Sequence, residues 1–312
     1  MIPFRRILFP VDYSEPCQHA VPYVKDMAAK FSADLTVVRA FEFPPIGLME
    51  FGYEGTAAVM PAMTIADIQS IEENRLAEFV KQHLAGVKLR SVLKEGDTAQ
   101  AIEHIVKHEG VDLVMMPTRG QGAFRRLLLG SVTSKVLHDA SCVVWTDAHA
   151  KPTGYRPNIP YKSVVCAMGF SEESRAILNG AAAIAREYGA SLHIVHSVET
   201  PPAAYEVDFG PFRKELIESA EASLQKLRAE AKVEATITVG SGAVAEVVRA
   251  EAEKHKADLV VTGRGHSQGA LSRVWSALYS VVREAPCPVL TIKTPLKLQT
   301  QERAVCEAAV SN

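Results

Sequence analysis

The most constraining feature of this sequence is an internal repeat. The segment that begins at Asp112, DLVMMPTRGQGAFRRLLLGSVTSKVLHDASCVVWT, has a counterpart that begins at Asp258, DLVVTGRGHSQGALSRVWSALYSVVREAPCPVLTI. The start of the chain recurs as well, because ILFPVDYSEPCQHA from Ile7 aligns without a gap to VVCAMGFSEESRAI from Val164. Few residues are identical, but the apolar positions and the strand lengths agree. The chain is therefore a tandem duplication, and each copy is long enough to bury a core of its own.

Composition and charge exclude several classes of protein. The 34 basic and 36 acidic residues are divided almost evenly between the halves, so neither half has the basic excess typical of nucleic-acid binding. The five cysteines form no close pairs, which favours a reducing compartment over a disulfide framework. Phe4-Arg5-Arg6 leads into a short strand rather than a signal peptide, and no apolar run approaches the roughly 20 residues of a membrane span. We expect a soluble cytoplasmic protein with neither a membrane nor a nucleic acid as partner.

Each half reads as alternating strands and helices. In the first half, short apolar runs predict strands buried on both faces, at 7–11, 35–40, 91–94, 113–116 and 142–146. Helical periodicity predicts a helix capped by Ser14 and further helices at 64–85, 99–108 and 131–139. The second half repeats this, with Ser171 as the first cap, a helix at 211–231 and strands at 192–195, 259–262 and 288–292. This alternation predicts the α/β class, with a doubly wound, five-stranded parallel sheet in each half.

Proline and glycine indicate where the domains end. The segment DAHAKPTGYRPNIP, which begins at Asp147, is typical of a linker. We expect a first domain at 1–147, a linker at 148–160, a second domain at 161–295 and a C-terminal tail at 296–312. The segment 43–63 is long, apolar and rich in glycine, and a lid, a partner surface and a simple loop all stay open for it.

The loop after the fourth strand of the first half has the features of a phosphate site. Pro117-Thr118-Arg119-Gly120 ends the strand, and nine residues later Gly130 and Ser131 open a helix. Gly120 permits a positive φ and a close approach of the backbone to a ligand. The helix start offers free N–H groups, and its dipole favours anions. The alternative is a tight turn followed by an ordinary capped helix.

Asp12 ends the first strand. In a doubly wound sheet, ligands bind at the carboxyl ends of the strands, where the strand order reverses. Asp12 and the Thr118–Gly120 turn would flank that crevice. Asp12 has an alternative role, because an aspartate there can form a turn or cap the helix near Ser14.

These residues resemble the universal stress protein family. The resemblance holds for each half in turn, so that it covers nearly the whole chain. The family pattern is Gly, two residues, Gly, nine residues, Gly, then Ser or Thr, with an aspartate at the end of strand one. The first half matches it at Asp12, Gly120, Gly130 and Ser131, but Pro117 stands where the first glycine belongs and has no N–H. The resemblance implies a Rossmann-like sheet of order 3-2-1-4-5, ATP binding in some members, and dimers joined through the fifth strands.

The resemblance implies a stress-response regulator that binds ATP, or another adenine nucleotide, in its first half, with Mg²⁺ if the ligand is ATP. The expected site comprises an adenine side and a phosphate side, formed by Val11, Asp12 and Ala40 and by Thr118, Arg119, Gly120, Gly130 and Ser131, respectively. The opposing interpretation, which Pro117 favours, is a nucleotide-free interaction or scaffold protein with unidentified partner proteins. An ATP-hydrolysing enzyme is third, because the sequence offers no clear general base and no paired carboxylates for a metal.

The second half departs from the family pattern. Aligning Arg264-Gly265 with Arg119-Gly120 places Trp275-Ser276 at the position of Gly130-Ser131, and Gly169 stands at the position of Asp12. A tryptophan there would occupy the space of a phosphate, so we expect a degenerate site. The second half then serves to complete the assembly.

The fifth strands would leave an apolar edge exposed if each half stood alone. We therefore expect 142–146 and 288–292 to pair antiparallel across a local two-fold axis, as an intramolecular pseudo-dimer. Whether whole chains also form a homodimer stays open.

Overall fold

The computed structural model describes residues 2–42, 64–118, 129–147, 159–198, 210–264 and 271–293. The strands of the first half are β1 (Arg6–Pro10), β2 (Asp34–Phe41), β3 (Leu89–Glu95), β4 (Leu113–Pro117) and β5 (Val143–Asp147). Its helices are α1 (Glu15–Phe31), α3 (Ile65–His83), α4 (Thr98–Glu109) and α5 (Ser131–Asp139). The strands of the second half are β6 (Ser163–Ala167), β7 (Ser191–Val198), β8 (Thr236–Ser241), β9 (Leu259–Gly263) and β10 (Val289–Ile292). Its helices are α6 (Ser174–Tyr188), α7 (Gly210–Ala231), α8 (Val244–Lys254) and α9 (Leu271–Glu284).

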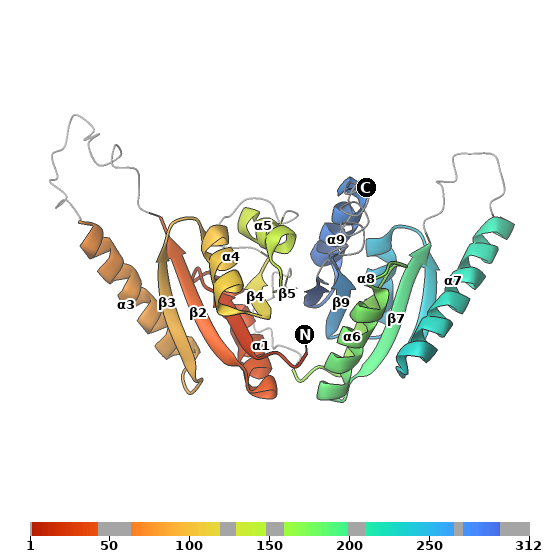
Figure 1. Ribbon diagram of the computed structural model, residues 1–312, viewed down its shortest axis with the longest axis horizontal. Helices are drawn as coiled ribbons and strands as arrows, with labels where there is room; N and C mark the ends of the chain where they lie inside the picture. Colours follow the sequence, from red (N-terminus) through yellow and green to blue (C-terminus); the bar gives the residue numbers. More distant parts are fainter. Residues whose placement is uncertain are drawn as a thin grey trace, which may run out of the picture.

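All ten of these strands belong to one sheet, in the order β3-β2-β1-β4-β5-β10-β9-β6-β7-β8. Neighbouring strands within each half are parallel, whereas β5 and β10 run antiparallel in the middle of the molecule (Figure 1). Each half thus has the order 3-2-1-4-5, and α3 and α7 lie at the two outer ends. The expected fold class, two tandem doubly wound α/β units, is confirmed.

Side chains cap the starts of α1, α3 and α4. The Ser14 hydroxyl accepts the Cys17 N–H at 3.3 Å, as expected for an N-cap. Thr64 and Asp67 form a reciprocal capping box at the start of α3. The expectation for Ser171 is wrong, because α6 begins at Ser174, and Ser171 instead donates its N–H to the Ser174 hydroxyl at 2.8 Å. That bond belongs to a turn that precedes the helix, so the helix starts later than its sequence indicates.

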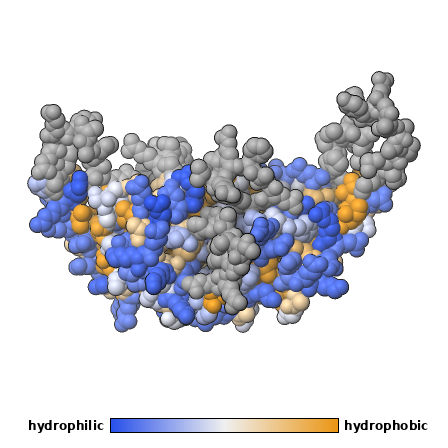
Figure 2. All heavy atoms as spheres, turned by 180° about the vertical axis from the view of Figure 1, so that it is seen from behind, coloured by the Kyte–Doolittle hydropathy of each residue, from blue (hydrophilic) through white to orange (hydrophobic). Residues whose placement is uncertain are grey.

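The hydrophobic core forms two layers, one on each face of the sheet. Residues alternate along each strand, so that Ile7 and Phe9 pack with α1 on one face and Leu8 packs toward α4 and α5 on the other. Both layers contain side chains from both halves, and the core is therefore continuous across the middle of the sheet. Hydrophilic side chains cover most of the described surface seen in Figure 2, with hydrophobic residues scattered among them.

An aspartate holds the first strand of each half. Asp258 is 4% exposed, and its Oδ2 accepts the N–H groups of Lys162 and Ser163 at 2.6 and 3.0 Å. Asp112 does the same in the first half, accepting the N–H groups of Arg5 and Arg6 at 2.8 and 3.2 Å. The Asp-Leu start of the fourth strand is therefore structural, since it satisfies backbone donors at the amino end of the sheet.

The β5–β10 contact obeys a local two-fold axis. Trp145 faces Leu290, its own counterpart in the repeat, at the centre of the paired strands. The Thr146 hydroxyl donates to the Val289 carbonyl at 3.4 Å, and the Thr291 hydroxyl donates to the Val144 carbonyl at 3.2 Å. Because the two threonines are equivalent in the repeat, these bonds are reciprocal, as in an isologous interface.

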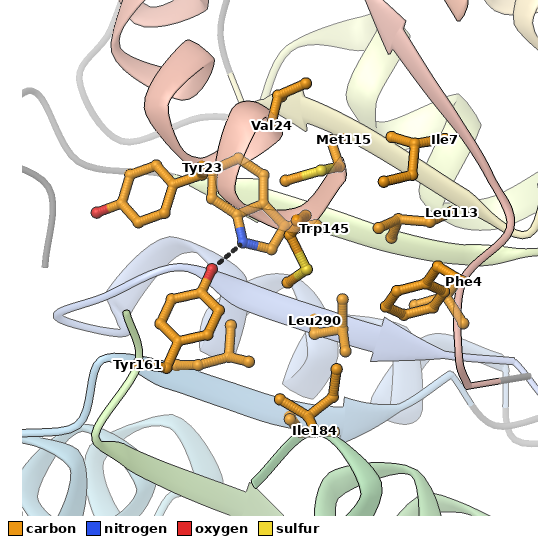
Figure 3. Close-up of a cluster of buried hydrophobic side chains, with 14 of the residues drawn as sticks. Phe4, Ile7, Tyr23, Val24, Leu113, Met115, Trp145, Tyr161, Ile184 and Leu290 are labelled. Carbon is orange, nitrogen blue, oxygen red and sulfur yellow. Dashed lines mark hydrogen bonds between the residues drawn. The ribbon is translucent and has the colours of Figure 1, made fainter. Parts of the chain in front are cut away.

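Aromatic residues fill the junction between the halves. The Trp145 indole donates to the Tyr161 hydroxyl at 3.1 Å, and both side chains are buried (Figure 3). Tyr23 of α1 packs against both rings, with centroids 5.1 and 6.3 Å away. Tyr188 of α6 then donates its hydroxyl to Asp26 of α1 at 2.6 Å. The junction therefore combines large apolar burial with satisfied polar groups, which favours one fixed arrangement of the halves.

The register of β5 against β10 can be tested with a disulfide. Val144 and Thr291 face each other, so Val144→Cys combined with Thr291→Cys should form a disulfide within one chain during oxidative refolding. Val144→Cys with Val289→Cys is the matched control, because that pair is diagonal and should link poorly. Peptide mapping by mass spectrometry identifies the links. Equal yields for the two pairs would contradict the register, and links only between chains would contradict the intramolecular pairing.

Replacing Asp258 tests the anchoring of β6. Asp258→Ala leaves two N–H groups at the start of β6 without their acceptor, and we expect the free energy of unfolding to fall by about 3 kcal/mol. Asp34→Asn is the control, since Asp34 is exposed at the start of β2, and it should change stability by less than about 0.5 kcal/mol. Urea denaturation measures both, and equal stabilities for the two variants would refute the anchoring role.

Candidate functional site

The predicted site lies where the strand order reverses, between β1 and β4. Val11 continues β1, and its N–H donates to the Val38 carbonyl at 2.8 Å. Asp12 follows it, and the buried Ala40 lies near the end of the adjacent β2. Thr118 follows β4, whose first residues pair with β1. The carboxyl ends of these three strands share one edge of the sheet.

Two of the predicted residues meet at the start of α5. The Gly130 N–H donates to the Thr118 carbonyl at 2.9 Å, which joins the end of β4 to the helix. Ser131 is the first residue of α5 and is exposed. Arg119 and Gly120 lie outside the described residues, as does the segment 43–63.

Asp12 has the turn role that the sequence left open. Its Oδ1 accepts the Ser14 N–H at 3.0 Å and the Ser14 hydroxyl at 2.6 Å. These bonds span Tyr13, which has a φ of 64°, so Asp12 holds a strained turn that leads into α1. One carboxylate oxygen is thus engaged within the chain.

Thr118 is likewise committed to the fold. It is 1% exposed, and both its N–H and its hydroxyl reach the Asp147 carbonyl, at 3.1 and 3.2 Å. The preceding Pro117 uses its carbonyl to accept the Thr133 hydroxyl at 3.1 Å. The end of β4 is therefore tied to β5 and to α5, and Thr118 shapes the crevice without presenting its hydroxyl to a ligand.

The start of α5 has the chemistry of an anion site. Gly130 is its N-cap, with φ −63° and ψ 149°, and no side chain of the described residues caps this end. The N–H groups of the first turn have no partner within the helix, and the dipole makes this end positive. The Gly130 φ suits any residue, so the backbone conformation at this position does not require glycine.

A cationic and aromatic cluster borders Asp12. The Arg39 guanidinium binds Glu72 at 2.8 Å, and Arg75 binds the same carboxylate at 2.9 Å. Both guanidinium groups lie over the Tyr13 ring, 5.1 and 4.9 Å from its centroid. Burial, followed by the nearby Glu72 charge, raises the pKa of Tyr13 to about 12, so its hydroxyl stays protonated at neutral pH. The sequence offered one signal for this cluster, namely an arginine inside the apolar run of β2.

A cavity of about 660 Å³ lies at the opposite edge of the sheet, at the amino ends of the first-half strands. Arg90 and Glu109, which form an ion pair, line it together with Thr36. Arg6, also in its lining, donates to the Glu109 carbonyl at 2.7 Å. Arg6 and Arg90 are thus already engaged within the fold, and the cavity does not coincide with the predicted site.

The second half matches the first differently from the expected alignment. The Arg264 N–H donates to the Ile292 carbonyl at 2.8 Å, as the Thr118 N–H donates to Asp147 in the first half. Arg264 is therefore equivalent to Thr118, one position away from the expected match with Arg119. The reason is that β9 pairs with β10 in the same register as β4 pairs with β5. The two halves differ by one residue in length only after Arg264 and Thr118. Arg264 is buried and points toward the first half.

The described residues offer neither a metal cluster nor a membrane-spanning helix. These residues contain no cluster of three or more His, Cys, Asp or Glu side chains that could hold a metal ion. No helix in the described ranges has the length and hydropathy needed to span a membrane. The groups near the carboxyl ends of β1 and β4 are the first N–H groups of α5, the Asp12 carboxylate and the guanidinium groups of Arg39 and Arg75.

Comparison with known proteins links each half to one family. A universal stress protein from Thermus aquaticus is 32% identical over 142 residues, which is 45% of this chain and 96% of that protein. One from Methanocaldococcus jannaschii is 26% identical over 143 residues, covering 45% of this chain and 80% of the relative. Each relative thus corresponds to about half of the chain.

Solved structures match the full length. A protein of unknown function from Pseudomonas aeruginosa has a TM-score of 0.64 and 18% identity, with 99% of this chain and 98% of that chain covered. A universal stress protein from Archaeoglobus fulgidus has a TM-score of 0.63 and 22% identity, with 92% and 98% covered. At these identities the two structures show the fold alone. The universal stress protein family model matches residues 3–146 and again 160–293, and the chain therefore belongs to the universal stress protein family as a tandem two-domain member.

Proposed function

We propose that this chain is a stress-response regulatory protein that binds one adenine nucleotide, ATP with Mg²⁺ or a related ligand, in its first half. The observation that carries the proposal is the start of α5, where no side chain caps the helix and the Gly130 N–H joins it to Thr118 at the end of β4. This end of the helix combines free N–H groups with a favourable dipole, which suits a phosphate. The domains in this proposal span 1–147 and 161–295, joined by a linker at 148–160 and followed by a tail at 296–312.

Pro117 limits the site without removing it. A proline there supplies no N–H to a phosphate, and its carbonyl is already bound to Thr133. The remaining donors are the first N–H groups of α5 and the exposed Ser131 hydroxyl, together with Arg119 and Gly120 in the proposed assignment. The adenine lies on the other side, near Val11, Asp12 and Ala40. The proposed affinity thus depends mainly on the helix start.

A nucleotide-free interaction protein is the second candidate, and one observation favours it. Asp12, Thr118 and the Gly130 N–H all make hydrogen bonds within the chain. A crevice whose polar groups satisfy one another needs no ligand for its stability. In that case the first half contributes a protein-binding surface, and ATP does not bind.

Calorimetric titration of the full chain with ATP and Mg²⁺ distinguishes the two candidates. We expect a stoichiometry near one, and Gly130→Val should lower the affinity by roughly tenfold or more, since its side chain fills the space left for a phosphate. Gly169→Ala is a control in the second half, because a Cβ there meets no atom within 4 Å, and it should leave binding unchanged. Two sites, no binding at saturating ATP, or unchanged affinity in Gly130→Val would each refute the assignment.

Two substitutions at Asp12 separate its turn role from a ligand role. Asp12→Asn keeps an acceptor for Ser14 but loses the charge, whereas Asp12→Ala loses both. We expect the free energy of unfolding to fall by about 1 kcal/mol in Asp12→Ala and to change little in Asp12→Asn. If the carboxylate also contacts the nucleotide, the affinity for ATP falls in both variants. Urea denaturation and titration measure the two effects, and wild-type values throughout for Asp12→Ala would show that Asp12 has neither role.

A further inference from the structure

Helix α5 of the first half is held by side chains from the second half. Tyr279 of α9 donates its hydroxyl to the Ser134 carbonyl at 3.3 Å. Arg264, which follows β9, donates to the Leu137 carbonyl at 2.8 Å and also to the Cys142 carbonyl. Lys293, which follows β10, donates to the His138 carbonyl at 3.3 Å. The donors come from three separate elements and converge on α5 and the turn that follows it.

Arg264 is the central member of this group. It is 1% exposed, and among the described residues no carboxylate pairs with it. Burial lowers its pKa to about 10, so the guanidinium keeps its charge at neutral pH. A buried charge is costly unless polar groups pair with it, and here the Leu137 and Cys142 carbonyls accept from the two terminal nitrogens, while the buried Nε has no hydrogen-bond partner. The last carbonyls of a helix have no partner within it and carry the negative end of the dipole, which favours a cation.

At equivalent positions of the two halves, the second half donates to the first but the first does not donate to the second. Thr118 stands at the position of Arg264 in the first half, and its hydroxyl stays within its own half, at Asp147. Ser134 stands at the position of Tyr279, since the Ala140 and Ala285 N–H groups close their helices in the same way. The two-fold axis places equivalent elements face to face, but among the described residues the long donors of this contact belong to the second half. A symmetric pair of identical domains could not show this difference.

We infer that Arg264 is a positioning residue through which the second half sets the nucleotide affinity of the first. This inference rests on the proposed function, because the phosphate site is at the start of α5 and Arg264 binds its end. A helix of nine residues is only about 13 Å long, so its two ends move as one body. Figure 1 shows α5 and α9 on either side of the middle of the molecule, where this contact is made. Arg264 itself does not touch the ligand.

Arg264→Met tests the inference in the full chain, by hydrogen exchange and by ATP titration. Methionine keeps the length and the apolar stem but removes the charge and the donors. We expect amide exchange in α5 to rise roughly tenfold while exchange in β1 and β6 stays unchanged, and the affinity for ATP to fall roughly five- to tenfold with the stoichiometry kept. Arg264→Lys keeps one charged donor and should restore part of both effects. Arg283→Met is the control, since Arg283 is exposed and pairs with the adjacent Glu284, and it should change neither.

Each outcome decides a separate point. Unchanged exchange in α5 of Arg264→Met overturns the positioning role, whatever happens to ATP. Faster exchange with unchanged ATP affinity overturns the coupling to the site. If the wild-type chain binds no ATP, the proposed function fails, and the exchange result still shows whether Arg264 holds α5. If Arg264→Met does not fold, Arg264→Lys keeps the charge but can replace only one of the two guanidinium contacts, and it should raise exchange in α5 a few-fold. Unchanged exchange in α5 of that variant would overturn the inference.

Discussion

The antiparallel pairing of β5 with β10 is the contact on which the rest of this molecule depends. It removes the apolar edge that each five-stranded sheet would otherwise expose, and it joins the two sheets into one. It also lets the core layers on both faces run through both halves, with Trp145 and Tyr161 buried at the junction. Because Trp145 faces Leu290, the local two-fold axis is fixed, and with it the approach of α5 to α9.

Because the shared sheet is held by residues common to both halves, the sequences of the two halves can differ at the ends of the strands. Both copies keep the residues that the frame needs, such as the aspartate before β4 and β9 and the threonine in β5 and β10. They differ at the ends of the strands, where Asp12 corresponds to Gly169 and Thr118 to Arg264. In the proposed division of roles, the first half keeps the ligand crevice and the second half supplies donors that hold its helix.

The crevice of the first half is built largely from groups that already have partners. Asp12 holds the turn into α1, and Thr118 holds the end of β4 against β5. A ligand there would rely on the first turn of α5 and on the surrounding charge of Arg39, Arg75 and Glu72. The proposed site therefore depends more on the position of α5 than on any single polar side chain. In our inference, the second half sets that position.

The sequence by itself determined the duplication, the strand and helix alternation and the fold class, because these follow from local periodicity and capping. The bounds of α5, 131–139, are those that its periodicity predicts, and Ser14 caps α1 as expected. Only the tertiary structure decided that Ser171 starts no helix, that Arg264 matches Thr118 and that Arg39 binds Glu72. Arg264 and Leu137 are 127 residues apart, and no local pattern relates them. Such contacts depend on strand register and on the packing of elements distant in the chain, neither of which local patterns of a single sequence specify.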